Sequence, residues 1–149
     1  MLNTIKSWFN FEIIELKKLN GYDNVNYLLT TETDNYIFKT YVFTEDMLAL
    51  IEAENSVLQR LKKDQSFPEP IPFATGDFLK ITTIDGVKTI CRLLSFLEGT
   101  FLGDATHTPE LLASIGRFTT QMDLQLVDLN NYVLKARQWE WDLQYLHLN

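Results

Sequence analysis

A lysine in an apolar stretch, and a glutamate in the apolar stripe of the helix predicted to follow it, constrain this fold most. Lys39 lies within residues 36–41, whose aromatic and β-branched side chains favour a β-strand. Glu54 falls on the helical face that Met47 and Ile51 define. An unpaired charge on a buried face is costly, so opposite charges on two such faces are expected to meet. The sequence therefore predicts that this strand and helix pack together with Lys39 facing Glu54.

Each of these charges, taken alone, has a simpler explanation. Lys39 alone fits an edge-strand lysine whose ammonium reaches solvent along a packed stem. Glu54 alone fits a residue at the edge of the stripe, with its carboxylate in water. Glu52 falls well off the stripe and is expected to face solvent. The functional interpretation therefore depends on Lys39 and Glu54 occurring together.

Composition and charge exclude several classes of protein. The chain has 149 residues, 46% hydrophobic and 22% charged, which predicts one domain or one and a half small lobes and no disorder. Its net charge of −7 argues against nucleic-acid and anionic-membrane partners. The single cysteine, Cys91, rules out an intrachain disulfide, and no Cys/His cluster suggests a structural metal. Without an apolar run of membrane or signal-peptide type, we expect a cytoplasmic protein.

Periodicity and turn-forming residues predict an α+β fold. Strands are expected over 11–19, 25–30, 36–42, 78–83 and 87–96. Short polar turns between neighbouring strands, including Asp85-Gly86, predict antiparallel pairing. Helices are expected from the cap Thr44 to about residue 63, from the cap Thr108 to about residue 127, and over 134–148, which holds Trp139 and Trp141. The proline-rich residues 68–72 are expected to form an extended linker.

Several short segments, in a fixed order, carry a resemblance to a known family. They are residues 21–27, 36–39, Glu54 with Leu58 and Leu61, 67–71, 91–100, 112–124 and 137–143. Together they resemble the aminoglycoside phosphotransferase and choline kinase superfamily, most closely its hydroxylysine kinase and homoserine-kinase-like branch. Two positions depart from that pattern: Asn24 stands where the branch often has a second acid, and Asp123 where the family often has a histidine.

The resemblance implies a protein-kinase-like small lobe, a five-stranded antiparallel sheet with one long helix, over residues 1–97. The hinge and the first helices of the large lobe would occupy residues 98–149. Lys39 would orient the α- and β-phosphates of ATP or GTP bound with Mg²⁺, and Glu54 would position Lys39. The residues expected to cover the phosphates are Gly21, Tyr22, Asp23 and Asn24, and those expected to hold the base are Ser95, Phe96 and Leu97. A plain hairpin turn remains the alternative for residues 20–24, which contain one glycine.

The chain lacks the His-Gly-Asp catalytic loop of the superfamily and its metal-binding aspartate. The resemblance therefore implies the N-terminal part of a kinase that phosphorylates a hydroxyl on an amino acid, amine or aminoglycoside-like acceptor. This part would be inactive alone, with no catalytic residue or metal ligand of its own. A non-catalytic nucleotide-binding or regulatory module and a plain α+β interaction domain are the alternatives. Exposed C-terminal helices would favour a homodimer.

Overall fold

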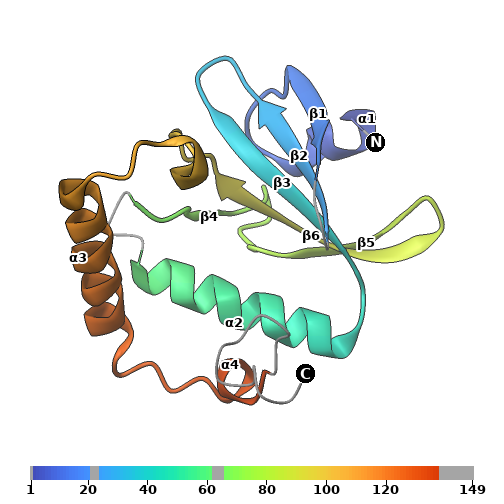
Figure 1. Ribbon diagram of the computed structural model, residues 1–149. Coiled ribbons are helices and arrows are strands. Elements are labelled where there is room, and N and C mark those ends of the chain that lie inside the picture. Colours follow the sequence, from blue (N-terminus) through green and yellow to red (C-terminus); the bar gives the residue numbers. More distant parts are fainter. Residues whose placement is uncertain (1, 21–23, 62–65, 138–149) are drawn as a thin grey trace.

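The computed structural model of the chain describes residues 2–20, 24–61 and 66–137 (Figure 1). The predicted roles of Gly21, Tyr22 and Asp23, and the predicted helical positions of Trp139 and Trp141, lie outside these residues. The elements, in order, are α1 (Leu2–Ile5), the 3₁₀ turn η1 (Lys6–Trp8), β1 (Glu15–Leu19), β2 (Val25–Thr30), β3 (Asn35–Val42), α2 (Glu45–Leu61), β4 (Pro70–Ile71), β5 (Lys80–Ile84), β6 (Val87–Ser95), the 3₁₀ turn η2 (Leu102–Asp104), α3 (Pro109–Leu126) and α4 (Tyr132–Ala136).

The strands form one antiparallel sheet in the order β1-β2-β3-β6-β4, with β5 also paired to β6. The α+β class, with an antiparallel sheet and one long helix, is confirmed. The prediction of five strands was wrong by one, because the proline-rich segment does not merely link two elements. Pro70 and Ile71 pair with Leu94 and Leu93 as a sixth, two-residue strand. Proline is tolerated there because an edge strand needs hydrogen bonds on one side only.

The two faces of the sheet are covered by different parts of the chain (Figure 1). Phe38 on β3 and Leu93 on β6 lie on one face, in a buried cluster with Ile5, Phe9 and Ile13 from the N-terminal segment. Because side chains alternate along a strand, the residues between them point to the other face. There Tyr41 and Ile90 pack against Ile51 of α2. The strand–helix packing predicted from the sequence is therefore confirmed.

The start of α2 follows from its cap. The Thr44 hydroxyl accepts a hydrogen bond from the Met47 N–H at 3.0 Å, and Glu45 and Asp46 place negative charge at the positive end of the helix dipole. The predicted end near residue 63 falls outside the described residues, since α2 is described to Leu61.

The Asp85-Gly86 hairpin between β5 and β6 is also confirmed. Asp85 has φ 50° and Gly86 has φ 82°, so both central residues adopt the left-handed conformation that two-residue hairpin turns require. This tight turn fixes the pairing of Ile84 with Val87 and thereby the register of the whole β5–β6 ladder.

The C-terminal elements stand beside α2 rather than on the sheet (Figure 1). Thr108 caps α3 as predicted by accepting from the Leu111 N–H, and Arg60 of α2 donates from Nε to the Gln125 carbonyl at 2.6 Å.

The predicted helix over 134–148 was wrong in its start and its continuity, since α4 begins at Tyr132 and the backbone is extended at Arg137. Several apolar side chains here are exposed, namely Leu112, Leu124, Val127 and Tyr132. Self-association through them stays a prediction.

Within the described segments, none of the helices combines the length and the apolar character needed to cross a membrane.

Cys91 should be chemically inert in the folded chain. Its side chain is fully buried, and burial raises the pKa of its thiol to about 12. The reactive thiolate is therefore scarce at neutral pH. We expect labelling by a pyridyl disulfide to be negligible in buffer and to become fast only in urea, along the unfolding curve. Rapid labelling of the native chain would contradict this placement of β6.

Candidate functional site

A cavity of about 180 Å³ opens between β3, β6, α2 and the segment after α4. Its wall is formed by Asn24, Lys39, Tyr41, Met47, Leu50, Ile51, Glu54, Arg92 and Arg137. Lys39 and Glu54 therefore face the same cavity. Larger hollows of about 470 and 440 Å³ flank α2, but their walls lack this concentration of basic side chains. We therefore take the smaller, charged cavity, here called the Lys39 pocket, as the candidate site.

The strand pairing places Lys39 between two polar neighbours. It lies opposite Asn26 on β2 and opposite Arg92 on β6. Its side chain is partly buried, and that burial, with the Arg92 charge, lowers the pKa of the Lys39 ammonium, while Glu54 acts in the opposite direction. Among the described residues, no carboxylate lies within 4 Å of the Lys39 ammonium, which lies over the Tyr41 ring at 5.9 Å from its centroid.

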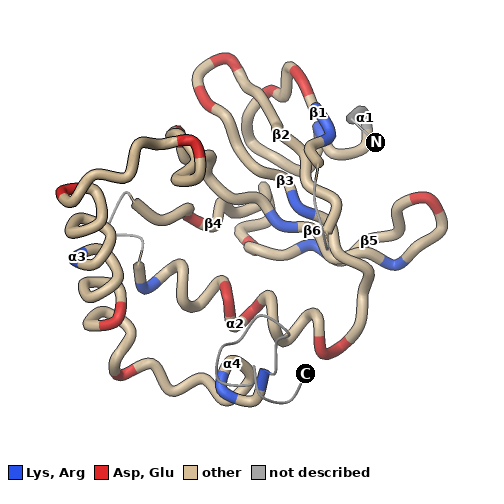
Figure 2. Tube along the Cα trace, viewed as in Figure 1, with Lys and Arg blue, Asp and Glu red and all other residues tan. Residues whose placement is uncertain are grey.

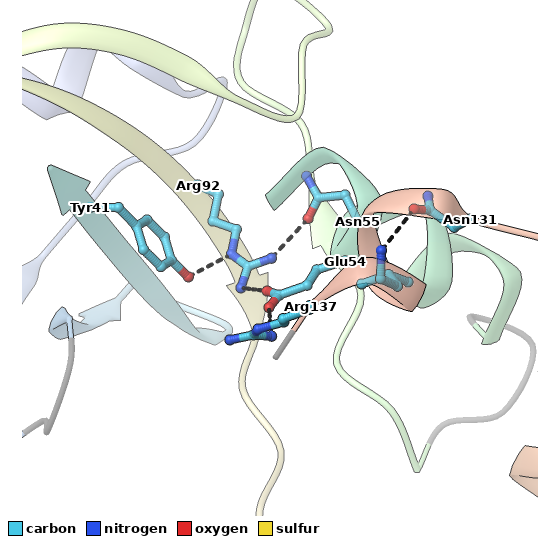
Figure 3. Close-up of polar contacts among 7 residues, drawn as sticks. Tyr41, Glu54, Asn55, Arg92, Asn131 and Arg137 are labelled. Carbon is cyan, nitrogen blue, oxygen red and sulfur yellow. Dashed lines mark hydrogen bonds and ion pairs between the residues drawn. The ribbon is translucent and has the colours of Figure 1, made fainter. Parts of the chain in front are cut away.

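The ion pair predicted between Lys39 and Glu54 was therefore wrong in its partner. The Glu54 carboxylate accepts from the Arg92 Nη2 at 2.8 Å, and its other oxygen lies 3.5 Å from the Arg137 Nη1 (Figure 3). Arg92 takes the carboxylate because it stands directly opposite Lys39 in the sheet and presents a longer, forked side chain to α2. Glu52 is exposed, as expected from its position off the apolar stripe.

Arg92 is the residue that the sequence interpretation missed. It is only 4% exposed, yet it carries a full charge within the buried centre of β6. The signal was present: a charged residue between Cys91 and Leu93 is as unusual as Lys39 between Phe38 and Thr40. A buried arginine must find a partner, and Glu54 was the carboxylate already predicted to face the sheet.

The predicted base-binding residues lie away from the Lys39 pocket, at the end of β6. The Ser95 N–H donates to the Glu69 carbonyl, its hydroxyl accepts from the Glu69 N–H, and the Phe96 N–H donates to Asn35. The side chains of Phe96 and Leu97 are 39% and 43% exposed. These residues follow Arg92 by three to five positions, roughly 10–17 Å along an extended strand. Their assignment stays a prediction, as does that of Asn24, which does line the pocket.

The Lys39 pocket is positive in a chain that is negative overall. Among the described residues, Lys39, Arg92 and Arg137 line it with Glu54 as the one carboxylate, whereas the whole chain has a net charge of −7. Figure 2 shows basic positions on the paired strands β3 and β6, and acidic positions along α2 across from them. The described residues contain no group of three histidine, cysteine or acidic side chains placed to hold a metal. The described lining of the pocket, with three basic side chains, thus favours an anion.

Comparison with known proteins shows where this arrangement belongs. The family model described as "Phosphotransferase enzyme family" matches residues 15–147. The chain belongs to the phosphotransferase enzyme family. Hydroxylysine kinase of Xenopus laevis is 27% identical to it over 155 residues, which are 93% of this chain and 41% of that protein. The chain therefore spans less than half the length of this curated relative. The superfamily suggested by the motifs is confirmed.

Solved structures of two kinases share the fold of this chain. An amicoumacin kinase in complex with AMP-PNP and Ca²⁺ matches 99% of this chain and 45% of its own, with a TM-score of 0.74 and 19% identity. A microcompartment-associated aminopropanol kinase matches 95% of this chain and 44% of its own, with a TM-score of 0.67 and 16% identity. The chain thus shares its fold with these two kinases at low sequence identity.

Proposed function

We propose that this chain is the nucleotide-binding part of a small-molecule phosphotransferase. The observation that carries the proposal is the Lys39 pocket itself. Three basic side chains line a cavity between β3, β6 and α2, and Lys39 points into it without a carboxylate partner among the described residues. Lysine and arginine are the side chains with which proteins bind phosphate groups. Catalysis of phosphoryl transfer depends mainly on this kind of positioning and charge stabilisation.

Each predicted site residue has a place in this proposal. Lys39 contacts the α- and β-phosphates of ATP or GTP, and the Glu54 carboxylate lines the same pocket. Gly21, Tyr22, Asp23 and Asn24 cover the phosphates from the β1–β2 turn. Ser95, Phe96 and Leu97 hold the base. The separation between the pocket and the end of β6 supports this division, because an extended nucleotide must contact both.

The acceptor is proposed as a small molecule that carries both an amine and a hydroxyl. Hydroxylysine and aminopropanol, which name two of the similar kinases, share these groups. The acceptor hydroxyl would receive the γ-phosphoryl group. We propose that the catalytic base and the Mg²⁺ ligands come from a segment outside these 149 residues, which lack the His-Gly-Asp pattern of the superfamily.

A non-catalytic nucleotide-binding module is the second candidate. It is favoured by the same absence of a His-Gly-Asp loop in the 149 residues. In either case we propose a small lobe over residues 1–97 and the start of a helical lobe over 98–149. A His-Gly-Asp motif encoded beyond Asn149 would favour the enzyme.

Mg-ATP or Mg-GTP should stabilise the chain against thermal unfolding. A nucleotide at 100 times its Kd adds about 2.7 kcal/mol to the free energy of unfolding. Thermal shift and isothermal titration calorimetry should therefore detect binding, with adenosine and guanosine as controls that lack the phosphates. Equal effects from nucleoside and nucleotide would contradict a phosphate site at Lys39. No effect from any of them at millimolar concentration would contradict nucleotide binding by this chain.

A further inference from the structure

We propose that the chain has a second binding site, separate from the Lys39 pocket, for a small molecule that combines an amine, an apolar body and a carbonyl oxygen. The site is the hollow of about 470 Å³ between α2 and β5, here called the α2–β5 cavity. Small-molecule sites commonly have volumes of about 300–1,000 Å³. None of the described residues that line this cavity lines the Lys39 pocket, so the inference does not rest on the proposed function.

The first feature of the α2–β5 cavity is an apolar wall. Leu48 of α2 lies there with Phe78 and Leu79, which precede β5, and with Ile81 of β5. Leu48 and Leu79 also pack against the buried cluster that α2 shares with the sheet, so this part of the wall is supported by the core. Ile81, in contrast, is 45% exposed. Covering it removes apolar surface from water, which favours a ligand with an apolar body.

The second feature is an acidic rim without a counter-ion. Glu52 and Asp77 line the cavity, are exposed, and form no ion pair among the described residues. Lys80 is close in sequence, but its ammonium lies over the Trp8 ring at 5.2 Å from the centroid, and Trp8 packs against the core cluster on the other face of the sheet. The described lining contains no lysine or arginine. The charge of the rim is therefore complementary to an amine.

The third feature is a buried hydrogen-bond donor. Asn55 lines the cavity and is only 5% exposed, and its Oδ1 accepts from the Arg92 Nη1 at 3.2 Å (Figure 3). This contact directs the oxygen of the amide toward Arg92. The amide nitrogen carries two N–H groups, which have no hydrogen-bond partner among the described residues. Because buried polar groups are normally bonded, a carbonyl oxygen in the cavity is the partner that this donor lacks.

These three features together match the amide of a hydrophobic amino acid. Its amine faces Glu52 and Asp77, its side chain covers Ile81, and its carbonyl oxygen accepts from Asn55. Phenylalaninamide carries all three groups and is therefore the probe. Three related compounds each change one of them. N-acetylphenylalanine replaces the amine and adds a negative charge, glycinamide lacks the ring, and phenethylamine lacks the carbonyl.

The first experiment is a titration of the ¹⁵N-labelled chain with each compound, followed by amide chemical shifts in NMR. Phenylalaninamide should give saturable shifts centred on residues 48–59 and 77–81. N-acetylphenylalanine and glycinamide should give no saturable shifts. Phenethylamine should bind about twofold to tenfold more weakly than phenylalaninamide, which corresponds to the loss of one neutral hydrogen bond.

Four variants then test the separate contacts. Glu52→Gln and Asp77→Asn should each weaken phenylalaninamide binding about twofold to fivefold, as expected for an exposed charge pair. Ile81→Thr keeps a β-branched side chain on β5 and should weaken binding about threefold. Asn55→Asp still accepts from Arg92 but lacks the amide donor, so phenylalaninamide and phenethylamine should bind it equally well.

The matched control is Glu45→Gln, an equal loss of charge at an exposed position of α2 outside the cavity. It should leave the affinity for phenylalaninamide unchanged. Urea denaturation of every variant verifies that it is folded.

The inference is overturned if phenylalaninamide gives no saturable shifts up to its solubility limit, or if N-acetylphenylalanine binds equally well. Native affinity in both Glu52→Gln and Asp77→Asn would also overturn it. Shifts that centre on the Lys39 pocket and disappear in Lys39→Met would place the amine there instead. If Asn55→Asp or Ile81→Thr does not fold, the two exposed acidic positions and the compound series decide. The result with Mg-ATP does not enter, so a failure of the proposed function is seen separately.

Discussion

Replacing Lys39 with methionine should weaken Mg-ATP binding about a hundredfold while leaving the chain folded. Charge-assisted hydrogen bonds to phosphate are worth about 1.5–3 kcal/mol each, and methionine retains the stem without the charge. The fold should tolerate the change, because among the described residues Lys39 has no ion pair to lose. Its removal also relieves the repulsion between the positive charges of Lys39 and Arg92. Calorimetry gives the affinity, and thermal unfolding gives the stability.

Lys88→Met is the matched control for this experiment. Lys88 lies on β6 outside the Lys39 pocket, is exposed, and places its ammonium over the Phe43 ring. Its replacement removes an equal charge and should leave nucleotide affinity within a factor of about two, since exposed charges are strongly screened. Equal losses in the two variants would show that only the net charge matters. Native affinity in Lys39→Met would remove Lys39 from the phosphate site.

Replacing Phe38 with alanine should cost about 3–5 kcal/mol of unfolding free energy. Phe38 is fully buried, and its ring lies 6.3 Å from Trp8, 6.5 Å from Phe9 and 6.2 Å from Tyr27, measured between centroids. The cavity left behind cannot collapse easily, because these large rings come from separate segments. Since Phe38 precedes Lys39 on β3, the site should lose its support as well.

Urea denaturation measures this loss, and Phe101→Ala serves as the control. Phe101 is 84% exposed, so its replacement should change stability by no more than about 0.5 kcal/mol. A cost below about 1 kcal/mol for Phe38→Ala would mean that the N-terminal segment does not cover this face of the sheet as described.

The strands and the first long helix could be predicted because their signals are local. β2 depends on side chains that favour extended structure, and the Asp85-Gly86 turn depends on left-handed residues, both visible in a few consecutive positions. Pro70 and Ile71 were taken for a linker because their pairing with β6 is decided by Leu94 and Leu93, which lie 24 and 22 positions away in the chain, and because proline argues against a strand.

The candidate site was predictable in its location but not in its internal pairing. Lys39 and Glu54 were found as charges on faces that should be apolar, and they do face one cavity. Arg92 carried the same signal, yet choosing between two basic partners for one carboxylate requires the β3–β6 register. Arg137 lies eighty-three positions from Glu54, and no local pattern connects them.

The edge strands β1 and β4 affect whether this chain aggregates at high concentration. An open edge exposes backbone donors and acceptors that another chain can pair with, which leads to aggregation. The terminal strand β1 carries Lys17 and Lys18 at its centre, so an added strand would meet a row of positive charge. At the opposite end, the two-residue β4 begins with Pro70 and lies between Pro68 and Pro72, which leaves few N–H groups to donate. The strands β1 and β4 thus each resist intermolecular strand addition.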